Sequence, residues 1–345
     1  MWSLFRPILF RLHPETAHHL TLQIIRLGAF LPLNLLLRHS FSTPGRPVDA
    51  FGLHFPNAVG LAAGYDKDGI AWRGLASLGF GHIEIGTVTP RPQKGNPKPR
   101  LFRLVEDRAL INRMGFPGRG AEFVSRRLRG PGATAGVHPV DRRVILGVNL
   151  GINKDTPLEQ AGEDYLSLLR QFIFLADYLA INVSSPNTIG LRRLQGRKML
   201  TDLLGAIAQE RRLITAGRGG HAPILVKLAP DLSEKELDDA LDAILHTGMD
   251  GVIATNTSLE RGGLMSRQQA ESGGLSGEPL RARSEAVLRQ VVKKLDGRLP
   301  VVSVGGIMSP EDARRRLDLG AALVQVYTGL VYGGPGLVKQ IVQSL

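Results

Sequence analysis

The sequence contains no cysteine among its 345 residues. This absence excludes a disulfide framework, zinc or iron–sulfur sites with cysteine ligands, and any mechanism that uses a cysteine as nucleophile, acid or base. A cytosolic or cytosol-facing protein fits this composition best. With 43% hydrophobic and 21% charged residues, the chain can bury one large core, which suits a single α/β barrel or two smaller domains.

The N-terminal region lacks a hydrophobic run long enough to cross a bilayer. Its longest uncharged run, 27-LGAFLPLNLLL-37, has 11 residues and contains a proline and an asparagine, whereas a spanning helix needs ~20 mainly apolar residues. No cleavage site of a secretory signal is evident. Residues 4–12 and 14–30 instead predict two short helices, the second with an apolar face formed by Leu20, Ile24 and Leu27.

These two helices carry an unusual mixture of side chains. Residues 1–40 hold four arginines, one acid (Glu15) and many large apolar residues. A helix pair with this much apolar surface and arginines at its edges could lie in a membrane interface, or it could simply pack on the main domain. The sequence by itself leaves both interpretations open.

Acidic residues are few relative to basic ones, with 31 Asp plus Glu against 43 Lys plus Arg and a formal net charge of +12. This balance favours an anionic partner, such as nucleic acid, an acidic lipid surface or a phosphorylated cofactor, although it also suits a merely solubilising surface. The basic residues are scattered, and the sequence has no RNA-binding aromatic motif and no paired Cys/His finger. We therefore expect no nucleic-acid partner.

From residue 51 onward, short apolar runs alternate with helical patterns. Eight runs predict strands, at residues 58–64, 82–88, 144–151, 178–184, 223–230, 251–258, 300–307 and 322–329. Helical patterns lie between most of them, for example at 159–176, at 233–248 with Ser233 as cap, and at 309–320 with Ser309 as cap. Eight such units predict a closed (β/α)8 TIM barrel, an α/β fold. A doubly wound sheet is the alternative, but no Gly-rich dinucleotide fingerprint follows the first strand.

Each predicted strand finishes at a polar residue or a glycine, which a barrel would gather on its carboxyl-terminal rim. Amides and lysines at the ends of apolar strands are costly to bury unless a partner satisfies them, so the rim predicts a site for a polar ligand. The Gly-rich loops at 304–312 and 328–336 follow strands seven and eight, where barrels place a phosphate cradle. Lys227, inside the fifth strand, could stabilise a reduced flavin, form a Schiff base or serve as one half of a structural ion pair.

Several longer strings resemble one family. They are 61-LAAGYDKDG-69, 79-GFGHIEIGTVTPRPQKGNPKPRLFRL-104, 111-INRMGFPGRG-120, 147-GVNLGINKDT-156, 181-INVSSPNTIGLR-192, 226-VKLAPDL-232, 251-GVIATNT-257, 273-GGLSG-277 and 301-VVSVGGI-307. Together they resemble the quinone-dependent, class 2 dihydroorotate dehydrogenases. Class 1 members of that family lack N-terminal helices and use a catalytic cysteine, whereas this chain has the extension and carries Ser185 at the matching position.

The resemblance implies an FMN-dependent oxidoreductase that converts (S)-dihydroorotate to orotate in pyrimidine biosynthesis and passes electrons to a membrane quinone. It implies that residues 1–40 form a membrane-associating, quinone-channel segment and residues 41–345 the FMN-binding barrel. Implied flavin contacts are Ala63, Gly64, Tyr65, Asp66, Lys67, Thr87, Asn149, Asn182, Lys227, Thr255, Gly277, Gly306, Tyr327 and Thr328. Implied substrate contacts are Lys67, Asn112, Arg113, Met114, Gly115, Phe116, Asn182, Asn187, Asn256 and Thr257.

The same resemblance makes Ser185 the base that removes a proton from C5 of the substrate. Because a serine hydroxyl is a poor base, a relay must accept its proton, and Thr188 is the nearest candidate in the sequence. The implied quinone site comprises His18, Arg103 and Tyr327, and no metal is implied. We further expect a monomer at the cytoplasmic face of the cell membrane, held there as a peripheral protein.

Two rival functions have weaker support in the sequence. A tRNA dihydrouridine synthase is also a flavin barrel and is often basic, but that family acts with a catalytic cysteine, which this chain lacks. A non-catalytic scaffold or membrane-binding protein that uses the helix pair alone leaves the polar strand ends without a purpose.

Overall fold

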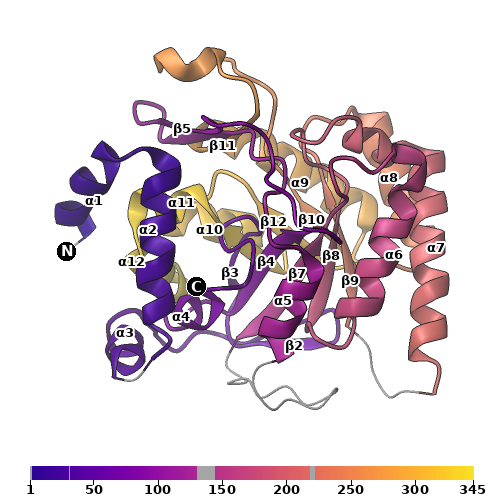
Figure 1. Ribbon diagram of the computed structural model, residues 1–345, viewed down its shortest axis with the longest axis horizontal. Coiled ribbons are helices and arrows are strands. Elements are labelled where there is room, and N and C mark those ends of the chain that lie inside the picture. Colours follow the sequence, from indigo (N-terminus) through magenta and orange to yellow (C-terminus); the bar gives the residue numbers. More distant parts are fainter. Residues whose placement is uncertain (1, 31, 130–143, 218–221) are drawn as a thin grey trace.

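A closed barrel of eight parallel strands forms the centre of the computed structural model, which describes residues 2–30, 32–129, 144–217 and 222–345 (Figure 1). The strands pair in chain order and the last closes on the first. They are β3 (Val59–Leu61), β4 (His82–Val88), β7 (Ile145–Leu150), β8 (Tyr178–Asn182), β9 (Ile224–Leu228), β10 (Gly251–Ala254), β12 (Val301–Val304) and β13 (Leu323–Val326). Each lies within one of the eight predicted segments, so the predicted (β/α)8 barrel is confirmed.

The strands read as continuous apolar runs because both of their faces are buried. In β9, for example, Ile224, Val226 and Leu228 belong to the core between the barrel and its helices. Leu225, between them, packs into the separate cluster inside the barrel. Lys227 has the same parity as Leu225, so the period of two of the strand directs its side chain to the barrel interior.

An outer layer of helices covers the barrel. It comprises α4 (Trp72–Ala76), α5 (Gly120–Arg129), α6 (Ala161–Phe172), α7 (Arg197–Thr215), α8 (Glu234–His246), α9 (Arg281–Leu295), α10 (Pro310–Asp318), α11 (Thr328–Gly333) and α12 (Gly336–Ser344). The described part of the chain also forms four 3-10 turns: η1 (Leu158–Gln160), η2 (Leu191–Gln195), η3 (Arg267–Ala270) and η4 (Glu278–Leu280). The predicted caps are confirmed, since Ser233 forms a capping box with Glu236 and Ser309 accepts from the backbone N–H of Asp312.

Two small sheets close the ends of the barrel and were not predicted from the sequence. The hairpin β1 (Val48–Ala50) and β2 (Leu53–Phe55) places Phe55 edge-on against His82, at the start of β4, with ring centroids 5.5 Å apart. At the opposite end, β5 (Leu101–Leu104), β6 (Ala109–Asn112) and β11 (Gly274–Gly277) form an antiparallel sheet in the order β11-β6-β5 (Figure 1). This second sheet forms one side of the ligand cavity described below.

The described residues of the N-terminal extension form three helices: the two predicted ones are confirmed, and the third was not predicted. They are α1 (Trp2–Arg11), α2 (Pro14–Leu27) and α3 (Leu33–Phe41). Gly28 is the C-cap of α2, so this helix ends at Leu27, before the predicted end at residue 30, and Pro32 is the N-cap of α3. Helix α2 packs so closely on α4 that a Cβ at Gly74 would lie 1.8 Å from the carbonyl oxygen of Ile25.

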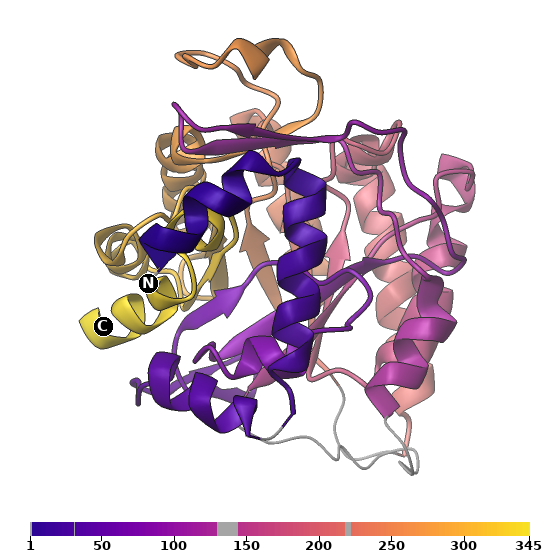
Figure 2. The same ribbon diagram turned by 60° about the vertical axis from the view of Figure 1, so that its left-hand side comes forward.

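Much of the apolar surface of this extension faces outward. Figure 2 shows α1 and α2 beside the barrel, with the amino-terminal end of α2 next to the sheet that contains β5. Exposed side chains are Leu4, Phe5, Ile8, Leu20, Ile24, Leu27, Phe30, Leu35 and Leu36. Within the described ranges, no helix is both long enough and apolar enough to cross a membrane.

Candidate active site

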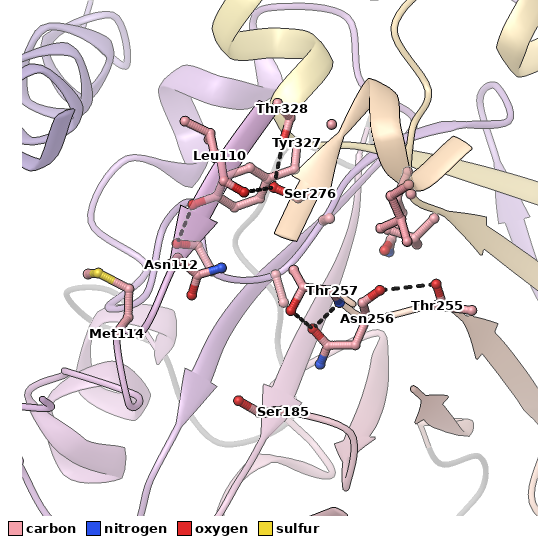
Figure 3. A pocket seen from close by; sticks show the side chains of 18 of the residues that line it. Leu110, Asn112, Met114, Ser185, Thr255, Asn256, Thr257, Ser276, Tyr327 and Thr328 are labelled. Atoms are coloured by element: carbon pink, nitrogen blue, oxygen red, sulfur yellow. Dashed lines mark hydrogen bonds between the residues drawn. The ribbon is translucent and has the colours of Figure 1, made fainter. Parts of the chain in front are cut away.

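A large cavity opens at the carboxyl ends of the barrel strands, and we call it the rim cavity (Figure 3). Its volume is about 1200 Å³, including the part open to solvent. Most of the predicted flavin and substrate residues line it: Ala63, Gly64, Lys67, Thr87, Asn112, Met114, Gly115, Phe116, Asn182, Asn187, Lys227, Thr255, Asn256, Thr257, Gly277, Gly306, Tyr327 and Thr328. Ser185 lines it as well.

Asn182, the last residue of β8, is the centre of a buried polar network on the floor of the rim cavity. Its Nδ2 donates to Thr87 Oγ1 at 2.9 Å and to Asn149 Oδ1 at 3.1 Å. The Thr87 hydroxyl donates in turn to Asn149 Oδ1 at 2.6 Å, and Asn256 Nδ2 donates to Asn182 Oδ1 at 3.2 Å. Asn149 thus lies one layer below the cavity and fixes the amide orientations of the residues that line it.

Lys227 forms an ion pair with Glu84, a residue that the sequence did not single out. Their Nζ and Oε1 atoms lie 3.6 Å apart, and both side chains are almost fully buried. The carboxylate also accepts from Asn149 Nδ2 at 2.8 Å, from Gln325 Nε2 at 2.9 Å and from the Tyr178 hydroxyl at 3.1 Å. The only sequence signal for Glu84 was an acid inside the apolar strand 82-HIEIGTV-88. Lys227 still lines the cavity, so the ion pair leaves its ammonium available to a ligand.

Gln325 adds a free acceptor to the same wall. Its Oε1 is buried and has no hydrogen-bond partner in the part of the chain that the structure describes. A buried acceptor without a partner is unusual, and the side chain lines the rim cavity. A ligand with an N–H group at this depth would satisfy it.

The two adjacent serines of the loop after β8 have different surroundings. Ser184 Oγ donates to Asn182 Oδ1 at 3.2 Å and accepts from Asn256 Nδ2 at 3.0 Å, so it belongs to the buried network. Within the described residues, Ser185 Oγ accepts only from the backbone N–H of Asn187, at 3.2 Å, and Ser185 lines the cavity. Thr188 is buried, does not line the cavity and, among the described contacts, makes no hydrogen bond to Ser185.

Polar groups converge on the part of the rim cavity nearest β6. Asn187 Nδ2 donates to Asn112 Oδ1 at 3.0 Å, and Asn256 Oδ1 accepts from the backbone N–H of Thr257 at 2.8 Å (Figure 3). Lys67 Nζ donates to the Gly64 carbonyl at 2.6 Å. Burial, together with the positive charge of Arg100, lowers the pKa of Lys67 to about 8. This part of the cavity therefore offers one cation and several amides that both donate and accept.

A glycine-rich wall stands at the ends of β12 and β13. Gly305 and Gly306 have φ values of +116° and +71°, and a Cβ at Gly306 would lie 2.3 Å from Arg281 Cα. Arg316 is fully buried below this wall and donates to the Gly305 carbonyl and to Ser284 Oγ, each at 2.8 Å. Burial lowers the pKa of Arg316 to about 10. Backbone amides and a rigid glycine turn of this kind suit a phosphate group.

A second cavity lies between the N-terminal helices and the barrel, and we call it the helix cavity. His18, Tyr65, Arg103 and Tyr327 line it among apolar side chains of α1, α2 and α11. The rings of His18 and Tyr65 meet edge-on at 5.0 Å, and those of Tyr65 and Tyr327 at 5.7 Å. His18, Leu101, Leu110 and Tyr327 line both cavities, so the two are adjacent.

Two basic side chains of the helix cavity, His18 and Arg103, differ in charge. Burial, together with the positive charge of Lys67, lowers the pKa of His18 to about 3, so its imidazole is neutral near pH 7. Arg103 donates from Nη1 to the Phe10 carbonyl at 3.0 Å and stacks over the Phe10 ring at 4.2 Å. Its Nε is buried without a partner in the described chain. A ligand carbonyl in the helix cavity would find a free guanidinium donor there.

Three predicted contact residues direct their side chains away from the rim cavity. The Asp66 carboxylate accepts from the backbone N–H groups of Ile70 and Ala71, at 2.8 and 2.7 Å, and so fixes the turn before α4. Arg113, which directly follows β6, pairs with Glu271 at 2.6 Å. Tyr65 lies in the helix cavity instead.

Comparisons with known proteins agree with this geometry. The family described as "Dihydroorotate dehydrogenase" matches residues 47–345. A "Dihydroorotate dehydrogenase (quinone)" of Halorhodospira halophila is 49% identical over 346 residues, which cover 100% of this chain and 97% of that protein. The protein of the same name from Azotobacter vinelandii is 47% identical, with 100% and 96% covered. A solved structure of DHODH from Eimeria tenella in complex with ferulenol is 38% identical, has a TM-score of 0.85, and covers 96% of this chain and 90% of its own. The chain belongs to the dihydroorotate dehydrogenase family.

Proposed function

We propose that this chain oxidises (S)-dihydroorotate to orotate and delivers the electrons to a quinone, as a step of pyrimidine biosynthesis. One observation carries the proposal: a polar cavity that contains Ser185 adjoins an apolar cavity under the N-terminal helices, and Tyr327 and His18 line both. A polar pyrimidine and an apolar quinone therefore have separate places that share one wall. The names of the relatives support the same pair of substrates.

FMN fits the remaining part of the rim cavity. The glycine wall suits its phosphate, the Gln325 oxygen that lacks a partner suits a ring N–H, and the Lys227 ammonium suits the electron-rich edge of the ring. We propose Ala63, Gly64, Thr87, Asn182, Lys227, Thr255, Gly277, Gly306, Tyr327 and Thr328 as its contacts, with Asn149 supporting them from below. When bound, FMN supplies the hydride acceptor that no side chain of this chain can provide.

The residues of the chain bind and orient the substrate. The Lys67 ammonium would bind the substrate carboxylate, while Asn112, Asn187 and Asn256 would hydrogen-bond the edges of its ring. Ser185 Oγ would accept the C5 proton, and the hydrogen at C6 would leave as hydride. Because no hydrogen bond joins Ser185 to Thr188 in the described chain, Thr188 would act as relay only through a bound water.

The quinone would bind in the helix cavity, among His18, Arg103 and Tyr327. The outward-facing apolar residues of α1, α2 and α3 would lie in the membrane interface, as expected of a peripheral protein, and the net charge of +12 would favour an anionic cytoplasmic surface. Because the extension can meet the bilayer without a partner subunit, a monomer is sufficient for this role.

The visible spectrum of the purified protein tests the function. We expect flavin absorption that bleaches when dihydroorotate is added without oxygen, and that returns when a soluble quinone analogue is added. A colourless protein that FMN cannot reconstitute would contradict the proposal. So would a flavoprotein whose absorption does not respond to dihydroorotate.

A further inference from the structure

Glu15 and Arg100 form a buried ion pair between the N-terminal extension and the barrel. Arg100 donates from Nη2 to Glu15 Oε1 at 2.7 Å and from Nε at 3.2 Å, and the two side chains are only 9% and 3% exposed. Glu15 lies in the first turn of α2, where the helix dipole stabilises a carboxylate. A buried guanidinium with two donors on one carboxylate has a fixed orientation.

The other edge of the Arg100 guanidinium holds the loop between β4 and β5. Nη1 donates to the carbonyl oxygens of Lys94 and Asn96, at 2.6 and 2.9 Å. Four of its five N–H groups are therefore engaged, two on α2 and two on the loop. The Glu15 carboxylate thus fixes the position of Arg100, and Arg100 in turn determines where residues 94–96 lie.

Asn96 continues this connection into the proposed substrate site. Its backbone N–H donates to the Met114 carbonyl at 2.9 Å, and its Nδ2 donates to the carbonyls of Arg113 and Asn187, at 3.0 and 3.1 Å. Met114 and Asn187 line the rim cavity, and Asn187 lies two residues after Ser185. A single side chain therefore connects the loop that carries the proposed base with the segment after β6.

The packing around this connection leaves little room for movement. A Cβ at Gly115 would lie 2.7 Å from Asn96 Nδ2, and a Cβ at Gly95 would lie 2.4 Å from the Met114 carbonyl. The backbone N–H of Arg113 also donates to the Arg100 carbonyl at 2.9 Å. A displacement of Arg100 must therefore shift the residues on which the substrate amide contacts depend.

We infer that Glu15 and Arg100 are positioning residues through which the docked helix α2 holds the pyrimidine site in its binding geometry. The inference rests on the proposed function, because the rim cavity is taken as the dihydroorotate site. It assigns a second role to the extension: the same helix that lines the helix cavity with His18 also orders the substrate side of the rim cavity.

The test compares Glu15→Gln with the parent protein, using FMN-loaded protein and two readouts. Titration of the flavin spectrum with orotate gives the dissociation constant, and dye-linked turnover gives KM and kcat for dihydroorotate. We expect the orotate dissociation constant and the KM to rise about tenfold, which is about 1.4 kcal/mol, with kcat changed less than about twofold. Arg100→Lys, which keeps the charge but loses the fork, should have the same effect.

Glu122→Gln is the matched control, because Glu122 pairs with Arg126 at 2.7 Å on an exposed face of α5. It should leave both readouts unchanged. Values within about twofold of the parent protein for both Glu15→Gln and Arg100→Lys would overturn the inference. An equal fall in kcat and FMN content, without a change in orotate binding, would also overturn it, since that pattern indicates a merely structural role.

Amide hydrogen exchange separates the inference from the proposed function. In Glu15→Gln without any pyrimidine ligand, residues 92–98 and 185–190 should exchange faster than in the parent protein, while β8 and β9 exchange at the same rate. If the parent protein fails to bind orotate, the proposed function is wrong and exchange alone still decides whether α2 orders these loops. Unchanged exchange in both loops would overturn the coupling.

Discussion

Replacing Ser185 by alanine should remove the proposed base and almost nothing else. The Ser185 hydroxyl has one hydrogen bond in the structure, from the backbone N–H of Asn187 at 3.2 Å, so its removal should cost about 1 kcal/mol of stability. The network of Asn182 and Asn256 does not include it, so FMN and orotate should bind as in the parent protein. The loss of general base catalysis should slow oxidation of dihydroorotate by ~10² to 10⁴.

Ser184→Ala provides a matched control one residue away. Its hydroxyl donates to Asn182 Oδ1 and accepts from Asn256 Nδ2, so its removal leaves two buried amide groups with a partner missing. We expect weaker orotate binding, by about tenfold, and a rate of oxidation at saturating substrate within a few-fold of normal. Ser185→Ala should therefore slow oxidation without weakening binding, whereas Ser184→Ala should weaken binding with little change in the rate.

Anaerobic stopped-flow measurement of flavin bleaching tests both variants. The limiting rate at saturating dihydroorotate reports the proton and hydride transfer, and the substrate concentration at half of that rate reports binding. A limiting rate for Ser185→Ala within about tenfold of the parent protein would refute the assignment of Ser185 as the base. So would equal rate losses in the two variants, because these would indicate a disturbed loop.

Three further predictions follow from the site. Glu84→Gln leaves the buried Lys227 ammonium without its counter-charge, so the free energy of unfolding should fall by ~3–5 kcal/mol in a urea titration; a loss below about 1 kcal/mol would contradict the ion pair. Since the pKa of Lys67 is lowered to about 8, its ammonium is present below that pH and lost above it. The orotate dissociation constant should therefore be constant below pH 8 and rise by up to about tenfold per pH unit above it. Lys67→Met should remove this pH dependence. If the dissociation constant of the variant still rises above pH 8, Lys67 is excluded as the cause. Deleting residues 1–40 should abolish turnover of a long-chain quinone but spare dye-linked kcat at saturating dihydroorotate; retained quinone turnover would exclude the helix cavity as the quinone site.

The barrel could be predicted from the sequence because its signal is local and repeated. Each strand is a short apolar run followed by an amphipathic helix, and caps such as Ser233 lie directly beside the segments that they terminate. The sheet of β5, β6 and β11 has no such signal. Its strands have four residues each, and its pairing of Asn112 with Gly274 joins positions 162 residues apart. No short stretch of the sequence contains both of these paired residues.

The candidate site likewise contains residues that the sequence could predict and residues that it could not. Motif resemblance located the residues that line the rim cavity, because a motif preserves order along the chain. It did not identify Glu84 or Gln325, which are single polar residues inside apolar strands, or Arg316, which is the last of three consecutive arginines in α10. Their roles depend on partners that the fold brings together, such as Lys227 for Glu84 and the Gly305 carbonyl for Arg316. In the sequence each was one unsatisfied charge or amide, and only the contacts show what satisfies it.

Glu15 shows that a count of charges in the sequence does not tell which charges reach the surface. It is the one acid among residues 1–40, and on an outward helix face it would oppose attachment to an anionic surface. The structure turns it inward, where Arg100 neutralises it, and leaves Arg6, Arg11 and Arg26 exposed on the same extension. One buried carboxylate thereby does two things: it removes the negative charge from the face proposed to meet the membrane, and it ties that face to the loop that holds Asn187. Withdrawal of α2 from the barrel would both expose this carboxylate and release the loop. Membrane attachment and an ordered substrate site therefore favour the same docked position of the helix.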